Sequence, residues 1–302
     1  SLFNLMKDAN GDITESTRFY GIGGASRIFG SFGMFLTKDL TVGVEAGYVF
    51  GKTENNVVNQ RTGVHLGTKH REVTNVRGAG VKLGVQYQKE LSNKLVLSLG
   101  ATLKFENKLN TEGSEYFFSL AVNDAAVEIP RDTLSNISIS GTIINPMKTG
   151  LGIGLGKANK WYAGLEYEFQ AALDIQGSII SASTSYAYGN SNKLSLGGFY
   201  LPKVNSISSY WERVTYRAGI RFEKTGLLIS TTPTTGGFTD INDFGISFGL
   251  GLPLGNRLSD LNLGLDYGKK GTTANNLIQE NYFNFRLSLS LSDTWFKKRR
   301  ID

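Results

Sequence analysis

Residues 283–292 read Phe-Asn-Phe-Arg-Leu-Ser-Leu-Ser-Leu-Ser, a stretch in which every second side chain is apolar. Successive side chains of a β-strand point to opposite faces, so this stretch has one apolar face and one polar face. A length of about ten residues matches a tilted strand that crosses the hydrocarbon core of a bilayer. Strands of soluble sandwiches are usually about five or six residues long. The stretch therefore predicts a membrane-spanning strand.

The same alternation recurs along the chain, whereas an apolar period of 3.6 residues is almost absent. We expect about eleven strands of this kind. They lie at 19–36, 40–51, 73–89, 95–108, 147–157, 160–173, 193–202, 212–224, 243–254, 261–269 and 281–293. The predicted fold class is all-β: an antiparallel up-and-down transmembrane β-barrel, with residues 1–302 as a single domain.

Composition agrees with such a barrel and excludes several other classes. Charged residues make up 19% of the chain, below the roughly 25% of soluble domains, and there are 18 Phe and 13 Tyr. The absence of cysteine excludes a thiolate metal site, a disulfide scaffold and a cysteine nucleophile. The net charge of +6 is dispersed, with one basic run at 297–300, so we expect no nucleic-acid binding.

The connections between the expected strands alternate in length. Short turns lie at 37–39, 92–94, 157–160 and 255–260, and long polar connections at 52–72, 109–146, 174–192 and 225–242. Outer-membrane barrels have short periplasmic turns and long outer loops, so the last strand should run towards the periplasm. The first expected strand then also runs towards the periplasm, which implies at least one strand before residue 1. Strand character at 115–123 and 135–144 predicts two further strands above the membrane.

The polar faces of the expected strands carry most of the charges. The side chains expected to face the lumen are Glu45, Lys82, Lys104, Glu166, Glu168, Arg213, Arg217, Arg221, Asp266 and Arg286. Charges in a barrel wall are tolerated where they face water or one another. The spacing of Arg213, Arg217 and Arg221 predicts a ladder on one strand. Such a ladder could guide anions or hold a plug, or it could form internal ion pairs with neighbouring carboxylates.

The opposite faces of the same strands are apolar and are expected to face lipid. The side chains for which we make this prediction are Phe248, Leu250, Phe285, Leu287, Leu289 and Leu291. Glycine is frequent at inward positions such as 150–156 and 245–251. The absent side chains either leave a path for a ligand or allow close packing.

The sequence offers no recognisable catalytic site, so we expect no enzyme, no cofactor and no metal. His65 and His70 lie five apart in a region expected to be a polar loop, where two histidines are more often solvated than bound to a metal. The glycine-rich stretches 21–24 and 152–156 lie within alternating strands with no helix after them, which excludes dinucleotide loops.

The C-terminal third carries motifs that resemble a known family. They are Tyr216–Gly219, Lys224–Leu227, Ile241–Leu254, Leu263–Gly268, Gly271–Thr273, Asn276–Ile278, Glu280–Phe283 and Trp295-Phe296. They resemble FadL/OmpP1-like outer-membrane β-barrels of the Bacteroidota type, closely over 213–302 and loosely upstream. The resemblance implies a fourteen-stranded barrel in a Gram-negative outer membrane, with a plug and three strands ahead of residue 1. No ligand-binding residue carries over, because that family's plug is not in this chain.

Two functions remain open at the level of sequence. One is a FadL-like channel for uptake of hydrophobic small molecules. The other is a non-transporting barrel subunit of a larger outer-membrane complex, in secretion or barrel assembly. The expected partners are outer-membrane lipid and, for the second function, other outer-membrane proteins or lipoproteins.

Overall fold

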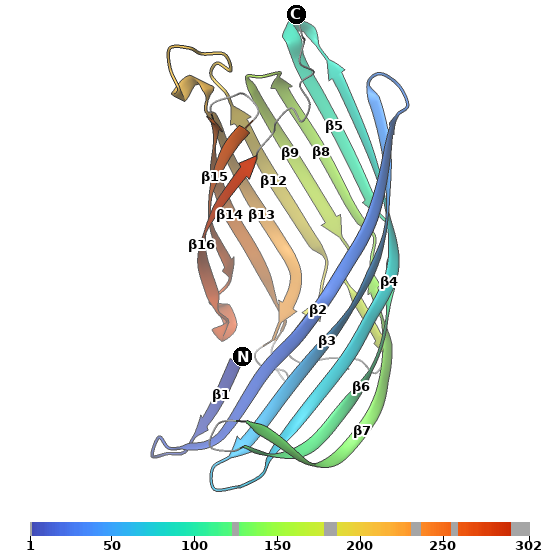
Figure 1. Cartoon of the computed structure of the whole chain (residues 1–302), viewed down its shortest axis with the longest axis vertical. Coiled ribbons are helices and arrows are strands. Elements are labelled where there is room, and N and C mark those ends of the chain that lie inside the picture. Colours follow the sequence, from blue (N-terminus) through green and yellow to red (C-terminus); the bar gives the residue numbers. More distant parts are fainter. Residues whose placement is uncertain (1, 123–126, 178–185, 231–236, 255–258, 291–302) are drawn as a thin grey trace, which may run out of the picture.

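The computed structural model describes residues 2–122, 127–177, 186–230, 237–254 and 259–290, which form one antiparallel sheet of 16 strands (Figure 1). Twelve strands follow one another around the wall. They are β1 (Leu2–Lys7), β2 (Ile13–Phe35), β3 (Leu40–Arg61), β4 (Gly67–Glu90), β5 (Leu95–Lys104), β8 (Lys148–Lys157), β9 (Trp161–Gln170), β12 (Ser191–Tyr200), β13 (Thr215–Ile229), β14 (Thr239–Leu254), β15 (Ser259–Gly271) and β16 (Gln279–Ser290). The wall contains a strand at each of the eleven predicted positions, which confirms the predicted fold class.

Four more strands lie off this path: β6 (Asn107–Val122), β7 (Glu128–Asn145), β10 (Asp174–Gly177) and β11 (Tyr186–Tyr188). In the described residues the helical elements are three single turns, η1 (Ser92–Lys94), η2 (Trp211–Arg213) and η3 (Ala274–Asn276). No helix in this part of the chain is long and apolar enough to cross a membrane. Strands β1 and β16 are the two ends of the path and do not pair with each other in the described residues, so the wall is an open, curved sheet.

The wall has an apolar face and a polar face, because the apolar residues of each strand pair with apolar residues of the next strand. In one cross-strand row, Phe248 pairs with Leu265 and Leu265 with Phe285, and all three side chains are exposed. Leu287 and Leu289 continue this face at 63% and 54% exposure, Leu250 is half-buried, and Leu291 lies outside the described residues. A continuous exposed apolar surface needs an apolar solvent, and lipid provides one. That these residues face lipid stays a prediction.

Strands β2, β3 and β4 are much longer than a bilayer requires, with 23, 22 and 24 residues. The predicted long loop at 52–72 is therefore wrong: β3 and β4 continue through it and turn only at 62–66. The apolar row of β3 ends at Phe50 and is followed by Lys52, Glu54 and Asn56, while the backbone pairing continues unbroken. The change to polar residues thus marks the edge of the apolar band rather than the end of the strand.

Strand β4 changes partner halfway along its length. Its residues 82–90 pair with β5, and its residues 67–77 pair with β6 of the β6–β7 hairpin. The two strands predicted at 115–123 and 135–144 are therefore present as parts of β6 and β7. We call residues 13–25 of β2, 51–61 of β3 and 67–77 of β4, together with the β6–β7 hairpin, the projecting wall (Figure 1, lower end).

At the opposite end of the wall the predicted turns at 37–39, 92–94 and 157–160 join consecutive strands, and residues 255–258 lie outside the described residues. The connection between β12 and β13 is the exception at this end. Residues 201–214 form a folded loop that contains η2, and its backbone hydrogen bonds include Lys203 N to Glu212 O and Leu201 N to Lys160 O.

Candidate functional site

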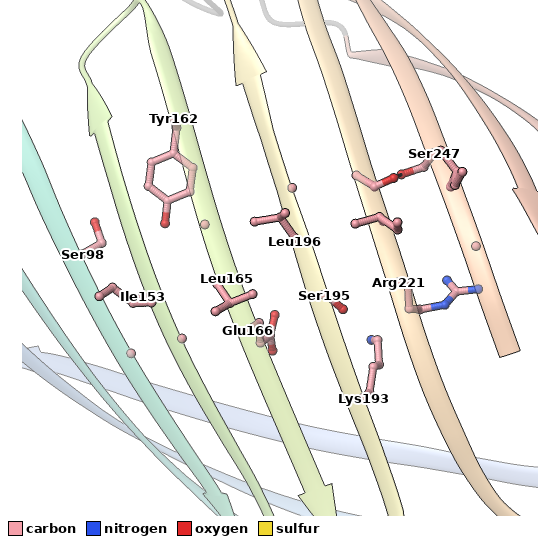
Figure 2. Close-up of a pocket in the computed structure, with 18 of the residues that line it drawn as sticks. Ser98, Ile153, Tyr162, Leu165, Glu166, Lys193, Ser195, Leu196, Arg221 and Ser247 are labelled. Carbon is pink, nitrogen blue, oxygen red and sulfur yellow. Dashed lines mark hydrogen bonds between the residues drawn. The ribbon is translucent and has the colours of Figure 1, made fainter. Parts of the chain in front are cut away.

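A cavity of about 550 Å³ lies on the polar face (Figure 2). Its lining runs from Gln86 on β4 to Tyr282 on β16 and includes residues of every wall strand between them. Strands so far apart in the path can line one cavity only on the concave side of the curved sheet. The polar face is therefore the inner face of the wall.

Charged and hydroxyl side chains of neighbouring strands point into this cavity (Figure 2). Glu166 comes from β9, Lys193 and Ser195 from β12 and Arg221 from β13. Asp266 of β15 also belongs to the lining. These groups suit water and polar ligands, because an apolar ligand would remove water from them. The lining also includes apolar side chains such as Leu165 and Leu196.

Glycines open the space in which two tyrosine rings pack across the inner face. A side chain at Gly154 or Gly156 would collide with the Tyr162 ring, and one at Gly268 with the Tyr282 ring. These glycines therefore serve close packing, one of the two uses that the sequence left open.

Arg221 is the centre of a polar network on the inner face. Its guanidinium donates from Nη2 to Tyr282 Oη at 2.7 Å and lies 3.4 Å from Asp243 Oδ2. Tyr282 in turn donates to Asp243 Oδ1 at 2.7 Å, and Glu223 lies 3.8 Å from Arg221 Nε. The network ties β13, β14 and β16 together. For Arg221, this network supports the alternative in which the arginines form internal ion pairs with neighbouring carboxylates.

Similar pairs recur around the inner face. Glu168 of β9 lies 3.1 Å from Lys148 of β8 and 3.7 Å from Lys193 of β12. Arg286 lies 3.0 Å from Asp266, and Arg217 donates to Asn262 at 2.7 Å. The ion pairs join neighbouring strands, and the Arg217–Asn262 hydrogen bond reaches from β13 past β14 to β15, so these side chains brace the wall.

The predicted three-arginine ladder is wrong in one member. Arg213 lies in η2 before β13 begins at Thr215, and its guanidinium stacks on the Tyr210 ring at 5.3 Å. Val214, the residue between η2 and β13, is fully buried. Only Arg217 and Arg221 share the inner face of β13.

A second cavity of about 360 Å³ lies further along the inner face, between β2 and β9. Its lining includes Lys82, Lys104, Lys148 and Glu168, together with Glu45, which accepts a hydrogen bond from Arg27. Within the described part of the chain, Lys82, Lys104 and Glu166 have no ion-pair partner, and neither do Arg213 and Arg217. The assignment of the sequence-predicted residues to a water-filled lumen stays a prediction.

The projecting wall carries a polar cluster that sequence reasoning missed. Lys69 of β4 donates to Tyr20 Oη of β2 and to Glu128 Oε2 of β7, both at 2.6 Å, and Tyr20 donates to Glu128 at 3.0 Å. Arg18 stacks on the Tyr20 ring at 4.8 Å. The residues lie up to 108 positions apart in sequence, so no local pattern could have predicted the cluster.

The surroundings shift the pKa of two groups in this cluster in opposite directions. Burial alone would raise the pKa of Glu128, but the hydrogen bonds from Lys69 and Tyr20 and the nearby cations lower it below its ordinary value. Burial alone would lower the pKa of Lys69, but its hydrogen bonds to Glu128 and Tyr20 raise it. Both groups are therefore charged at neutral pH and hold the start of β7 against β2 and β4.

The histidines differ from the expectation of a solvated pair in one loop. His65 lies in the turn at 62–66, but His70 is on β4 and lies 2.6 Å from Glu115 of β6. No cluster of three or more metal-binding side chains occurs among the residues that the structure describes.

Comparison with known proteins finds solved structures of the same general fold. A solved structure titled "CymD monoaromatic hydrocarbon channel" is 14% identical with a TM-score of 0.51, and the match covers 89% of this chain and 81% of that one. The toluene transporter TodX of Pseudomonas putida is 14% identical with a TM-score of 0.51, over 93% of this chain and 71% of that one. At this identity the likeness shows the fold alone. No curated protein sequence matches the chain, whereas the family model described as BamG matches residues 3–302.

Proposed function

Given that the chain belongs to the BamG family, we propose that it is an integral outer-membrane β-barrel that docks other outer-membrane proteins or lipoproteins as a subunit of a larger complex. The observation that carries this proposal is the projecting wall. In it, five paired strands (β2, β3, β4, β6 and β7) continue beyond the apolar band of β3, which ends at Phe50. This extension is confined to the N-terminal half of the sheet. A membrane barrel that only spans the bilayer needs no such extension.

The surface of the projecting wall carries exposed ion pairs and exposed aromatic side chains. Exposed ion pairs, Arg77 with Glu112 and His70 with Glu115, lie among side chains such as Phe117. Paired strands hold these groups in fixed positions, so a partner could bind with little ordering cost. Rigid polar and aromatic surfaces of this kind suit a specific protein contact.

Site-specific photo-crosslinking in intact cells tests the proposal. A photo-reactive residue at Glu112 on the projecting wall should give one reproducible adduct with a second protein. The matched control is Lys38, an exposed position in the turn at the opposite end of the wall. Charge reversal of Arg77 should reduce the adduct at Glu112 without altering the yield of folded barrel. Absence of any protein adduct from Glu112 would remove the docking proposal.

A second candidate, a channel for hydrophobic small molecules, is favoured by the likeness of fold to hydrocarbon channels. The charged lining of the inner cavity argues against it, since Glu166, Lys193 and Arg221 would have to be desolvated by an apolar substrate. Toluene uptake by cells that contain or lack this protein separates the two functions. Uptake that depends on the protein would favour the channel, and unchanged uptake would favour the docking subunit.

A further inference from the structure

The apolar face contains a recess of about 750 Å³ over β9, β12 and β13, extending to β16. Its floor is one cross-strand row of small residues, in which Ala163 pairs with Gly198 and Gly198 with Ala218. The next residue of the same row is Phe248, which is 61% exposed and forms a side of the recess. The apolar face of the wall is therefore indented here, because alanine and glycine stand where larger side chains would fill the space.

Aromatic side chains close the recess towards the short-turn end of the wall. Trp161, Tyr200 and Tyr216 form the adjacent cross-strand row, directly above the small residues. Tyr216 donates its hydroxyl to the carbonyl oxygen of Trp211, so the folded loop 201–214 is anchored at this edge. Tryptophan and tyrosine in such a row are typical of the membrane–water interface.

Three lysines lie at the end of the aromatic row or beyond it. Lys157 pairs with Trp161 across the β8–β9 ladder, Lys160 precedes Trp161, and Lys203 lies in the folded loop, whose Leu201 is hydrogen-bonded to Lys160. Within the described residues none of these lysines is ion-paired. Among the residues that the structure describes, the carboxylates of this region are Glu212 and Asp260, and Arg213 adds a fourth cation, so these positive charges are in excess.

We propose that this site binds one glycerophospholipid of the periplasmic leaflet. An acyl chain lies in the recess over Ala163, Gly198 and Ala218. The phosphate is held by Lys157, Lys160 and Lys203. An indented apolar floor, an interfacial aromatic row and unpaired cations follow one another in the order in which a lipid presents its chain, glycerol and phosphate. The leaflet follows from the short turns, which face the periplasm in outer-membrane barrels.

Native mass spectrometry of the whole protein, extracted from outer membranes in a mild detergent, tests this proposal. The wild-type protein should carry one phospholipid adduct. Ala218→Phe places a ring in the recess and should reduce the adduct about tenfold, the change that ~1.4 kcal/mol brings. The control Ala46→Phe adds the same ring at an exposed position on the apolar face of β3 and should leave the adduct unchanged.

The phosphate end is tested separately with Lys160→Glu combined with Lys203→Glu, against Lys38→Glu in a turn at the same end of the wall. Loss of the adduct in the double variant alone supports the proposal. Wild-type protein without a phospholipid adduct, equal adducts in Ala218→Phe and Ala46→Phe, or an adduct of lipopolysaccharide would each overturn it. Partner crosslinking from Glu112 is measured independently, so failure of the lipid site and failure of the docking function are distinguishable.

Discussion

Few large apolar side chains are buried in the described part of the chain; they are Val58, Leu120, Ile139, Val214 and Ile241. A soluble protein of this size would bury a continuous core, which is its main source of stability. Here the backbone ladders and the polar pairs between neighbouring strands take that role. A single residue therefore contributes to stability mainly by connecting neighbouring strands.

The hydrogen bonds of Glu128 give a direct test at the residue scale. Glu128→Gln removes the negative charge that Lys69 and Tyr20 hold and should destabilise the start of β7 by about 1–2 kcal/mol. Amide hydrogen exchange at residues 128–134 should become faster, while exchange in β14 stays the same. The control is Glu112→Gln, whose pair with Arg77 is exposed and should be worth less than about 1 kcal/mol. Equal effects of the two variants would contradict the role of Glu128.

Acid should reproduce the Glu128→Gln effect in the wild-type protein. The folded-state pKa of Glu128 lies below its ordinary value of 4.5, so its contribution to stability is present above pH 4.5 and is lost as the pH falls through the folded value. The protection factor of residues 128–134, which corrects the observed rate for the intrinsic pH dependence of exchange, should therefore fall below about pH 4.5 in the wild type. In Glu128→Gln the same segment should show little further loss of protection. An equal acid response of both proteins would assign the change to other groups.

At the scale of elements, alternation predicted every long strand of the wall, because each strand has one apolar and one polar face. It missed β1, whose Leu2 and Phe3 are adjacent and break the alternation. It also ended β3 too early, since residues 52–56 are polar on both faces although they remain paired with β2 and β4. The alternation of apolar and polar residues thus reports the medium around a strand, whereas the length of a strand depends on the neighbouring strands with which it pairs.

Alternation also assigns a face to each charged residue, but it does not give the partner of that residue. Position within a strand gives the face of Arg221 or Glu168, whereas the pairs of Glu168 with Lys148 and Lys193 depend on the register between strands. Arg213 shows where residue spacing alone fails. Its spacing from Arg217 fits a row of arginines on one strand, but β13 begins only at Thr215.

Adjacent residues of β16 test the two faces at the element scale. Leu287→Arg places a charge on the apolar face and should cost roughly 2–4 kcal/mol near the bilayer midplane. Ser288→Arg places the same side chain on the inner face, where water is available, and should cost less than about 1 kcal/mol. Urea unfolding of the two variants in lipid vesicles measures both values. A larger loss for Ser288→Arg would mean that the apolar face is not the lipid face.

At the scale of the whole molecule, the two ends of the wall differ in a way that fits two kinds of partner. One end carries the projecting wall, a rigid polar surface, and the other carries turns, the folded loop 201–214 and the cation-rich edge of the recess. Both the docking proposal and the lipid proposal depend on which end faces the periplasm. The orientation of the barrel in the outer membrane therefore has to be measured to interpret both proposals.

The absence of cysteine makes orientation measurable with single introduced thiols. Val64→Cys lies in the turn between β3 and β4, where the side chain is 50% exposed, and Lys38→Cys lies in the turn between β2 and β3 at the other end. A membrane-impermeant maleimide added to intact cells should label Val64→Cys and spare Lys38→Cys, because short turns face the periplasm. After the outer membrane is permeabilised, both should react, which controls for accessibility of the thiols. Labelling of Lys38→Cys alone in intact cells would invert the orientation. It would move the proposed lipid site to the outer leaflet and turn the projecting wall towards periplasmic partners.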